Sequence, residues 1–328
     1  MAREKKTIKS VVKQRFNYDV EDLAPYTDEQ SMDILTDLIF SAGLTSRISV
    51  MENVKGSEKI KLLSSSPVLQ SAESCGWTPS GGIILTDKTI TTERIKIQEE
   101  YCNEDLNGTW AQLMNSAGAN QQDQDAPFNE VMVTYYLKKA RLMNQNLMLN
   151  GDTTSMNANL AFYDGFVKKW ENDGAVVDYN SLETSITVTN AMSIALGLYN
   201  SIPAVLFDNG NEVEIMVGRE TFRKIIENNY NDNQYHYSIT EEAGVEPSFI
   251  LPTTNTRVRS YSQLNGTDKM FAVPLNYMFF GTDLESDVDG FEFKYNDTDE
   301  KLRFGVKWRS GVEYVYSEYF TRLDLATS

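Results

Sequence analysis

Histidine is almost absent from this chain of 328 residues, since His236 is the only one. Any site in which a serine or cysteine nucleophile relies on an imidazole base would depend on that residue. It lies among aromatic residues and asparagines (Tyr230–Tyr237), where a surface or loop histidine is the simpler interpretation. GxSxG, GxxxxGKS/T, GxGxxG and HExxH motifs are also missing. We therefore predict that the chain is not an enzyme, and we name no catalytic residue, metal ligand or cofactor.

Cysteine and long apolar runs are scarce as well. Cys75 and Cys102 are too few for a disulfide framework, and their spacing lacks the CxxC pairs of a zinc site. No segment approaches the roughly 18 apolar residues of a membrane span, and no apolar run follows the N-terminal residues as in a secretion signal. These absences favour a reducing compartment and argue against secretion and membrane insertion.

Basic residues are in the minority, with 30 Lys and Arg against 47 Asp and Glu, so the formal net charge is −17. An excess of acid argues against a nucleic-acid-binding surface over the whole chain, because phosphate contacts need cations. Residues 1–15 are the exception, with six bases and one acid. Within this basic arm, Arg3, Lys5 and Lys6 are candidates for contacts with neighbouring subunits or a polyanion. A mobile, solvated terminus is the alternative.

In the N-terminal half, helices and extended segments alternate. The capping box Thr27–Gln30 predicts the start of a helix, and two more helices are predicted over Asn103–Gly118 and Phe128–Asn150. The last of these would be roughly 35 Å long, at 1.5 Å per residue, and its apolar face is marked by Met132, Tyr136, Ala140, Met143 and Leu147. Between the first two helices, apolar residues alternate with polar ones on either side of the segment Ser64–Gly82, which is rich in turn formers. We predict a long, protruding two-stranded loop that needs a partner, because a loop of this length inside a compact domain is uncommon.

In the C-terminal half, an α/β segment precedes strands. The apolar pattern predicts a helix over Thr189–Tyr199, a strand over Glu212–Val217 and a helix over Arg219–Asn228. From Phe291 to Tyr316 the residues alternate at period two, which predicts a three-stranded antiparallel meander with turns at Asn296-Asp297 and Ser310-Gly311. We expect its aromatic residues to lie in the core and at interfaces, and we do not expect them to stack on nucleic-acid bases.

An acidic segment precedes this meander. Glu285, Asp287 and Asp289 alternate before Gly290, which approaches the pattern of a calcium-binding loop. The pattern deviates because Glu stands first, Asn296 stands in the last position, and a strand pattern follows instead of a helix. We therefore interpret it as a solvated acidic loop, which together with Asp283 could also meet a basic patch on a neighbouring subunit.

Read in order, these parts resemble the major capsid protein of tailed bacteriophages, the Hong Kong 97-like shell fold that encapsulins also use. The segment most similar to that family runs from Val273 to Leu284 (VPLNYMFFGTDL), and an Arg-Ser-Gly-Val sequence follows at Arg309–Val312. The resemblance implies an α+β fold whose parts are an N-terminal arm at 1–46, an extended E-loop at 47–101, a peripheral domain with a long spine helix at 102–180 and 284–328, and an axial domain at 181–283.

The resemblance also implies a function. The chain would assemble with itself as hexamers and pentamers into an icosahedral head shell, the virion capsid, in the host bacterial cytoplasm. Double-stranded DNA would be packaged inside without sequence-specific binding, and the expected partners are a separate scaffolding protein, a portal, and decoration or head-fibre proteins. Two alternatives remain open: the shell of an encapsulin-type nanocompartment, and an acidic cytoplasmic hydrolase that works with two carboxylates.

Two expectations concern contacts between subunits. Val68, Leu69 and Trp77 in the loop tip cannot form a core alone, so we predict that they lie over a neighbouring subunit. In the founding member of the family, a loop lysine forms an isopeptide bond with a neighbour's asparagine, assisted by a carboxylate. We predict no such cross-link here, although residues of each type occur at Lys59, Lys61, Lys88, Asn296 and Glu292.

Overall fold

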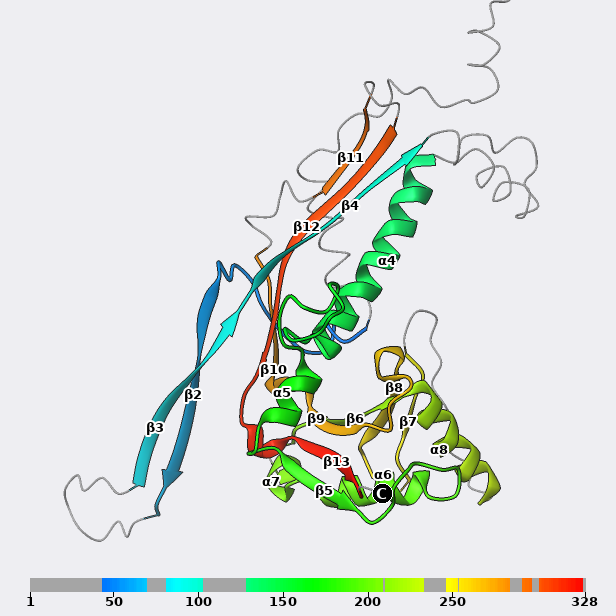
Figure 1. Ribbon diagram of the computed structural model, residues 1–328. Coiled ribbons are helices and arrows are strands. Elements are labelled where there is room, and N and C mark those ends of the chain that lie inside the picture. Colours follow the sequence, from blue (N-terminus) through cyan, green and yellow to red (C-terminus); the bar gives the residue numbers. More distant parts are fainter. Residues whose placement is uncertain are drawn as a thin grey trace, which may run out of the picture. The chain divides into compact units, whose positions relative to one another are not determined.

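The computed structural model describes residues 43–69, 81–102, 128–208, 210–232, 246–252, 254–283, 291–296 and 301–326 (Figure 1). The chain divides into two compact units. Unit 1 contains the described residues 94–102, 128–144, 283, 291–296 and 301–309. Unit 2 contains the described residues 43–69, 81–93, 145–282 and 310–326. Each unit is described by itself.

The centre of unit 2 is a mixed six-stranded sheet with the order β5-β13-β9-β6-β8-β7. Its strands are β5 (Val177–Ser181), β6 (Val213–Gly218), β7 (Ser248–Ile250), β8 (Arg257–Tyr261), β9 (Met270–Pro274) and β13 (Thr321–Leu325). β13 runs parallel to β5 and β6 runs parallel to β8, whereas the other neighbours are antiparallel. All six residues of β6 are buried, as expected for a strand covered on both faces.

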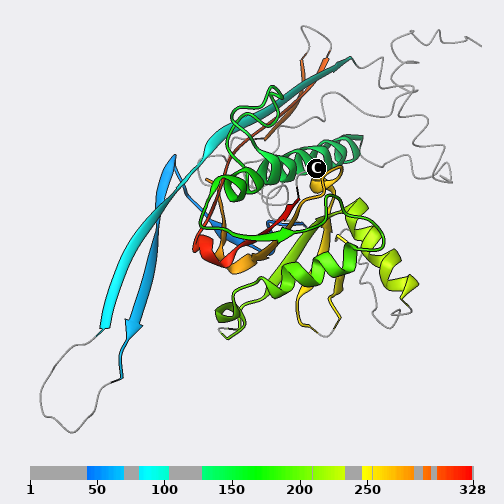
Figure 2. The ribbon, with the colours of Figure 1, turned by 60° about the horizontal axis from the view of Figure 1, so that its bottom comes forward.

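One face of this sheet is covered by helices. These are α6 (Ala191–Asn200) and α8 (Arg219–Asn231), which Figure 2 shows on the same side of the strands. α6 buries Ala191, Ile194, Ala195 and Leu198, a stripe with helical spacing, against the side chains of β6 that point the same way. The predicted helices at Thr189–Tyr199 and Arg219–Asn228 and the strand at Glu212–Val217 are thus confirmed, with ends shifted by up to three residues.

An aromatic cluster packs around α5 (Phe166–Asn172) in the same unit. Its centre is Trp170, whose ring lies 5.0 Å from that of Phe271 in β9 and 5.8 Å from that of Phe320. Phe166 stacks on Trp170 at 5.4 Å. Such ring pairs contribute about 0.5–1.5 kcal/mol each beyond the burial of their area, so this cluster ties α5 to β9 and to the segment before β13.

The long helix α4 (Phe128–Asn150) begins and ends where the sequence predicted. Gly151 ends it, and a Cβ at that position would lie 2.4 Å from the Tyr163 carbonyl oxygen. The buried face differs in one place. Met143 was expected on it but is exposed, while Asn144 is buried and accepts a hydrogen bond from Trp308 Nε1 at 3.2 Å. A polar residue fills this core position because its amide finds a partner.

In unit 1, β11 (Phe291–Asn296) and β12 (Lys301–Tyr314) form an antiparallel hairpin that pairs Phe291 with Val306 and Asn296 with Lys301. β4 (Glu93–Cys102) also pairs with β12 (Figure 1). Side chains of α4 pack on this sheet, and the rings of Tyr136 and Phe304 lie 4.7 Å apart.

The predicted three-stranded meander is wrong at its second turn. β12 continues through Ser310 and Gly311 as one strand and pairs at its C-terminal end with β10 (Met278–Gly281) in unit 2. Ser310 is fully buried, and its hydroxyl lies 2.6 Å from that of Tyr163. Gly311 is required for a close crossing, because a Cβ there would lie 2.0 Å from the carbonyl oxygen of Thr91. The Ser-Gly pair therefore serves packing and does not form a turn.

The outer part of the second predicted arm, at Ile95 and Ile97, lies in β4, and the inner parts of the two arms form a separate hairpin in unit 2. It consists of β2 (Ser57–Pro67) and β3 (Gly81–Thr91), paired antiparallel along their whole length, and both views show it running away from the six-stranded sheet (Figures 1 and 2). At its base, Ile60 and Ile90 are buried with Val54 and Val315. β1 (Ser49–Met51) precedes it and pairs parallel with β10.

The remaining short elements of the described residues are α7 (Ala204–Asp208) and three single turns of 3-10 helix, η2 (Ser262–Leu264), η3 (Leu275–Tyr277) and η5 (Ser317–Tyr319). The predicted helices at Thr27 and at Asn103–Gly118, the acidic segment at 285–289 and His236 lie outside the described residues.

Candidate functional site

The distal half of the β2–β3 hairpin exposes large aliphatic side chains on both of its faces. Leu63 stands opposite Leu85 on one face, and Ile83 follows on the same face. Ile84 lies on the other face, opposite Ser64. The exposed fractions are 60% for Leu63, 68% for Leu85, 72% for Ile83 and 62% for Ile84.

These exposures distinguish the hairpin from an ordinary half-buried sheet. A two-stranded hairpin with one buried face would alternate apolar and polar residues, and an isolated hairpin is marginally stable in water. In this hairpin, exposed aliphatic residues occur on both faces beyond the buried residues Ile60 and Ile90. A contiguous exposed apolar surface of this kind marks a site of interaction. The hairpin is therefore the strongest candidate for a protein-binding surface in the described part of the chain.

Two of the predicted contact residues lie beside this surface. Val68 and Leu69 directly follow β2 and are both exposed, Leu69 completely. Trp77 of the loop tip and Arg3, Lys5 and Lys6 of the basic arm lie outside the described residues. Their role in subunit contacts stays a prediction.

The lysines near the hairpin have partners within unit 2 or stand in solvent. Lys59 bonds Asp87 across the strands. Lys88 lies 3.8 Å above the ring of Tyr314 and 3.4 Å from Glu313 Oε1, whose other oxygen accepts a bond from Lys169. Lys61 is exposed. Lys88 therefore anchors the base of the hairpin to β12.

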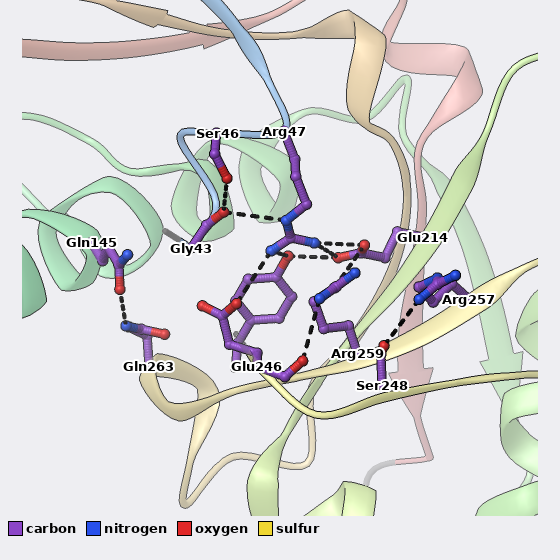
Figure 3. Close-up of polar contacts among 11 residues, drawn as sticks. Gly43, Ser46, Arg47, Gln145, Glu214, Glu246, Ser248, Arg257, Arg259 and Gln263 are labelled. Atoms are coloured by element: carbon purple, nitrogen blue, oxygen red, sulfur yellow. Dashed lines mark hydrogen bonds and ion pairs between the residues drawn. The ribbon is translucent and has the colours of Figure 1, made fainter. Parts of the chain in front are cut away.

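A second polar constellation lies on the face of the six-stranded sheet that α6 and α8 leave free (Figure 3). Glu214 in β6, Arg259 and Tyr261 in β8, and Arg47 just before β1 meet there, with Glu246 beside them. Glu214 is 4% exposed. A carboxylate buried to that extent is tolerated only with charged and hydrogen-bonding partners.

All acceptor positions of Glu214 are occupied. Arg47 Nη1 donates to Oε1 at 2.8 Å and to Oε2 at 2.6 Å. The Tyr261 hydroxyl donates to Oε1 at 2.5 Å, and Arg259 Nε donates to Oε2 at 3.1 Å. Burial raises the pKa of Tyr261 well above its ordinary value, and the Glu214 charge adds to this effect. The phenol thus stays a donor at all physiological pH values.

Arg47 connects this cluster with the chain that enters the hairpin. Its Nη2 donates to the Tyr261 hydroxyl at 2.7 Å, and its Nε donates to the carbonyl of Gly43 at 3.2 Å. Gly43 has a φ of +92°, and a Cβ there would lie 2.0 Å from Gln145 Nε2. The cluster therefore fixes the start of the segment that leads through β1 to β2.

The sequence pattern did not identify this cluster. Its signals are a glutamate inside the apolar strand VEIMVG and two arginines at alternate positions of RVRSY. A charge inside an apolar strand indicates a buried ion pair, but the pattern cannot name the partner, because Arg47 and Glu214 are separated by 167 residues.

Other site classes find no support in the described residues. No group of three or more His, Cys, Asp or Glu side chains there is placed to hold a metal ion. In the same part of the chain, no helix combines the length and the apolar character that a membrane crossing requires.

No protein-family model matches this sequence. No curated protein matches it either. Among solved structures, it is similar to a chain of the satellite phage P4 procapsid that includes the size determination (Sid) protein, with a TM-score of 0.59 and 11% identity over 97% of this chain and 99% of that chain. It is also similar to the capsid of an empty GTA particle, with a TM-score of 0.55 and 11% identity over 88% of this chain and 97% of that chain.

The similarity extends over nearly the full length of both chains and agrees with the long helix, the mixed six-stranded sheet and the separate hairpin described above. At this level of identity it establishes the fold. The chain has the Hong Kong 97-like fold of phage major capsid proteins.

Proposed function

We propose that this chain is a major capsid protein that assembles with itself, as hexamers and pentamers, into an icosahedral head shell enclosing double-stranded DNA. One observation supports this most strongly: in a chain with a capsid fold, the β2–β3 hairpin exposes aliphatic residues on both faces. A neighbouring subunit would cover them. Burying a Leu or Ile side chain contributes about 1.5–3 kcal/mol, so a few such residues would supply much of one contact.

In this proposal the hairpin is the E-loop and α4 is the spine helix of the peripheral domain. The basic arm, including Arg3, Lys5 and Lys6, contacts neighbouring subunits or the interior of the shell, where it offsets the acidic body. A separate scaffolding protein, a portal and decoration proteins complete the head. The assembled protein belongs to the virion and forms in the host bacterial cytoplasm.

Negative-stain microscopy of the expressed full-length protein, alone and with its scaffold, tests the proposal. Closed shells or sheets of hexamers are the expected result. A protein that stays monomeric at high concentration, across ionic strengths and with the scaffold present, would show that the proposal is wrong.

Variants connect assembly with the hairpin. Leu63→Ser and Leu85→Ser should leave the free energy of unfolding of the subunit within about 0.5 kcal/mol, as expected for exposed positions, but should reduce shell formation strongly. Leu182→Ser is the control, because Leu182 is also an exposed leucine but lies outside the hairpin. If the hairpin variants lose subunit stability or assemble normally, the hairpin is not the contact surface.

A further inference from the structure

A cavity of about 570 Å³ opens beside the Glu214 cluster, entirely within unit 2. Three arginines line it, namely Arg47, Arg257 and Arg259, together with Glu212, Glu214, Asn255 and Asn276 and the apolar side chains of Val213, Ile250 and Leu275. Arg257 and Arg259 stand two residues apart in β8, so their side chains are on the same face of the sheet (Figure 3).

Arg259 is held rigidly at the wall of this cavity. The residue is 7% exposed, its Nε donates to Glu214 and its Nη1 donates to the Glu246 carbonyl at 3.3 Å. Its Nη2 makes no hydrogen bond among the described residues. A guanidinium group that is held by two of its nitrogens and keeps further N–H donors is preorganised to bind a planar anionic acceptor such as a carboxylate.

Arg257 has no carboxylate partner in the part of the chain that the structure describes. It stands opposite Glu214 in the β6–β8 register, but the acceptor positions of Glu214 are taken by Arg47, Arg259 and Tyr261. Among the described residues, its side chain makes one hydrogen bond, to the Ser248 hydroxyl at 3.3 Å. A half-buried cation with one neutral partner is stabilised by an added carboxylate.

We propose that this cavity binds an acidic segment of a second copy of the chain, the segment with Glu285, Asp287 and Asp289. The sequence from Leu284 to Gly290 has three acids and no base. Bound as an extended peptide, this segment would place alternate side chains on one side at about 6.6–6.8 Å, which is the step between Arg257 and Arg259 along β8. Two of the three carboxylates would then match the two arginines in charge and in spacing.

The inference rests on the proposed self-assembly, because only an assembly of several copies would supply the acidic segment of another subunit. It is specific to this pair of sites and leaves the hairpin contact unchanged. Contacts of this kind would add orientation and specificity to the interface, and salt would weaken them at its exposed rim.

A labelled peptide of residues 283–291 tests the inference on unassembled full-length subunits by fluorescence anisotropy. The peptide should bind, and a peptide with E285Q, D287N and D289N should not. Arg257→Gln in the protein should weaken binding by about tenfold or more, because one charge-assisted pair is lost. Arg219→Gln is the matched control, since Arg219 is exposed and does not line the cavity. A peptide with D287R should regain affinity for the R257E protein.

Four results would overturn the inference. The first two are equal binding of the charged and neutral peptides, and unchanged affinity in Arg257→Gln with the fold intact by circular dichroism. The third is that the peptide binds only to a protein variant in which the acids of residues 285–289 have been neutralised. This result would show that the cavity is filled by the acidic segment of the same subunit. The fourth is displacement by a double-stranded DNA oligonucleotide at lower concentration than by unlabelled peptide, which would assign it to phosphate. Since none of these measurements needs particles, they are independent of the microscopy that tests shell formation.

Discussion

Gly281 and Gly311 stand opposite each other in the β10–β12 pair, and the chain between β3 and β4 crosses this point at backbone contact distance. A Cβ on Gly311 would lie 2.0 Å from the Thr91 carbonyl oxygen. A Cβ on Gly281 would meet Ile90 Cδ1 at 2.9 Å and Thr92 Cγ2 at 3.0 Å. The two glycines therefore allow the chain at the end of β3 to pack directly against β10 and β12.

We predict that Gly311→Ala destabilises the subunit by about 1–3 kcal/mol, as overpacking does, because the Thr91 backbone cannot turn away. Gly281→Ala should cost less, since the ends of two side chains can shift. Urea unfolding of both variants in the unassembled state measures the difference. Equal stability of Gly311→Ala and the unchanged chain would disprove the close crossing.

A second prediction concerns the buried carboxylate of Glu214. Glu214→Gln removes the negative charge between Arg47 and Arg259 and should destabilise unit 2 by about 3–5 kcal/mol, the usual effect of breaking a buried ion pair. Glu212→Gln, an exposed neighbour on the same chain segment, is the control and should change the free energy of unfolding by less than about 0.5 kcal/mol. Similar losses in both variants would contradict a specific role of Glu214.

A third prediction concerns the loop between α4 and α5, whose ends are joined by a backbone bond from Gly165 to Gly151. Asp152 accepts bonds there from Lys168 and Thr154, and these lower its pKa from 3.8 to about 2, the Lys168 bond most strongly. Because the folded pKa is depressed, Asp152 stabilises the loop above about pH 4. This contribution is lost as the pH falls from about 4 towards 2.

The carboxyl carbon of Asp152, followed by NMR, should titrate with a midpoint near 2 in the folded chain. Lys168→Met, which removes the cation that spans Asp152 and Asp164, should move the midpoint upward. A midpoint near the ordinary value in the unchanged chain would show that the network does not form in solution.

A fourth prediction is that assembled particles are not covalently cross-linked. Lys88 contacts Glu313 and the ring of Tyr314, and Lys59 bonds Asp87, so both side chains already have partners within their own subunit. Lys61 is exposed and is the remaining lysine of the hairpin that such a bond could use. Denaturing electrophoresis of particles should give one band near 37.2 kDa. A ladder of multiples would overturn the prediction and make these residues the first to mutate.

Several elements can be predicted from local signals in the sequence. The end of α4 follows from Asn150-Gly151, and its apolar residues recur at helical spacing from Tyr136 onward. β11 and the base of β2 follow from alternation at period two, whereas β3 begins within the segment that was expected to be a loop. Local signals suffice for these elements because capping, turn formation and periodicity depend on residues within a few positions of each other.

The roles of Ser310-Gly311, Asn144 and Glu214 depend on contacts between distant parts of the sequence. Ser-Gly reads as a turn until Tyr163 and Thr91, from distant parts of the sequence, fill the space around it. Asn144 replaces Met143 on the buried face of α4 because Trp308 supplies a donor. Glu214 is stable inside an apolar strand because Arg47, Arg259 and Tyr261 converge on it. A burial pattern in sequence cannot reveal such partners, since the energy of a buried polar group depends on neighbours that folding alone brings within hydrogen-bond distance.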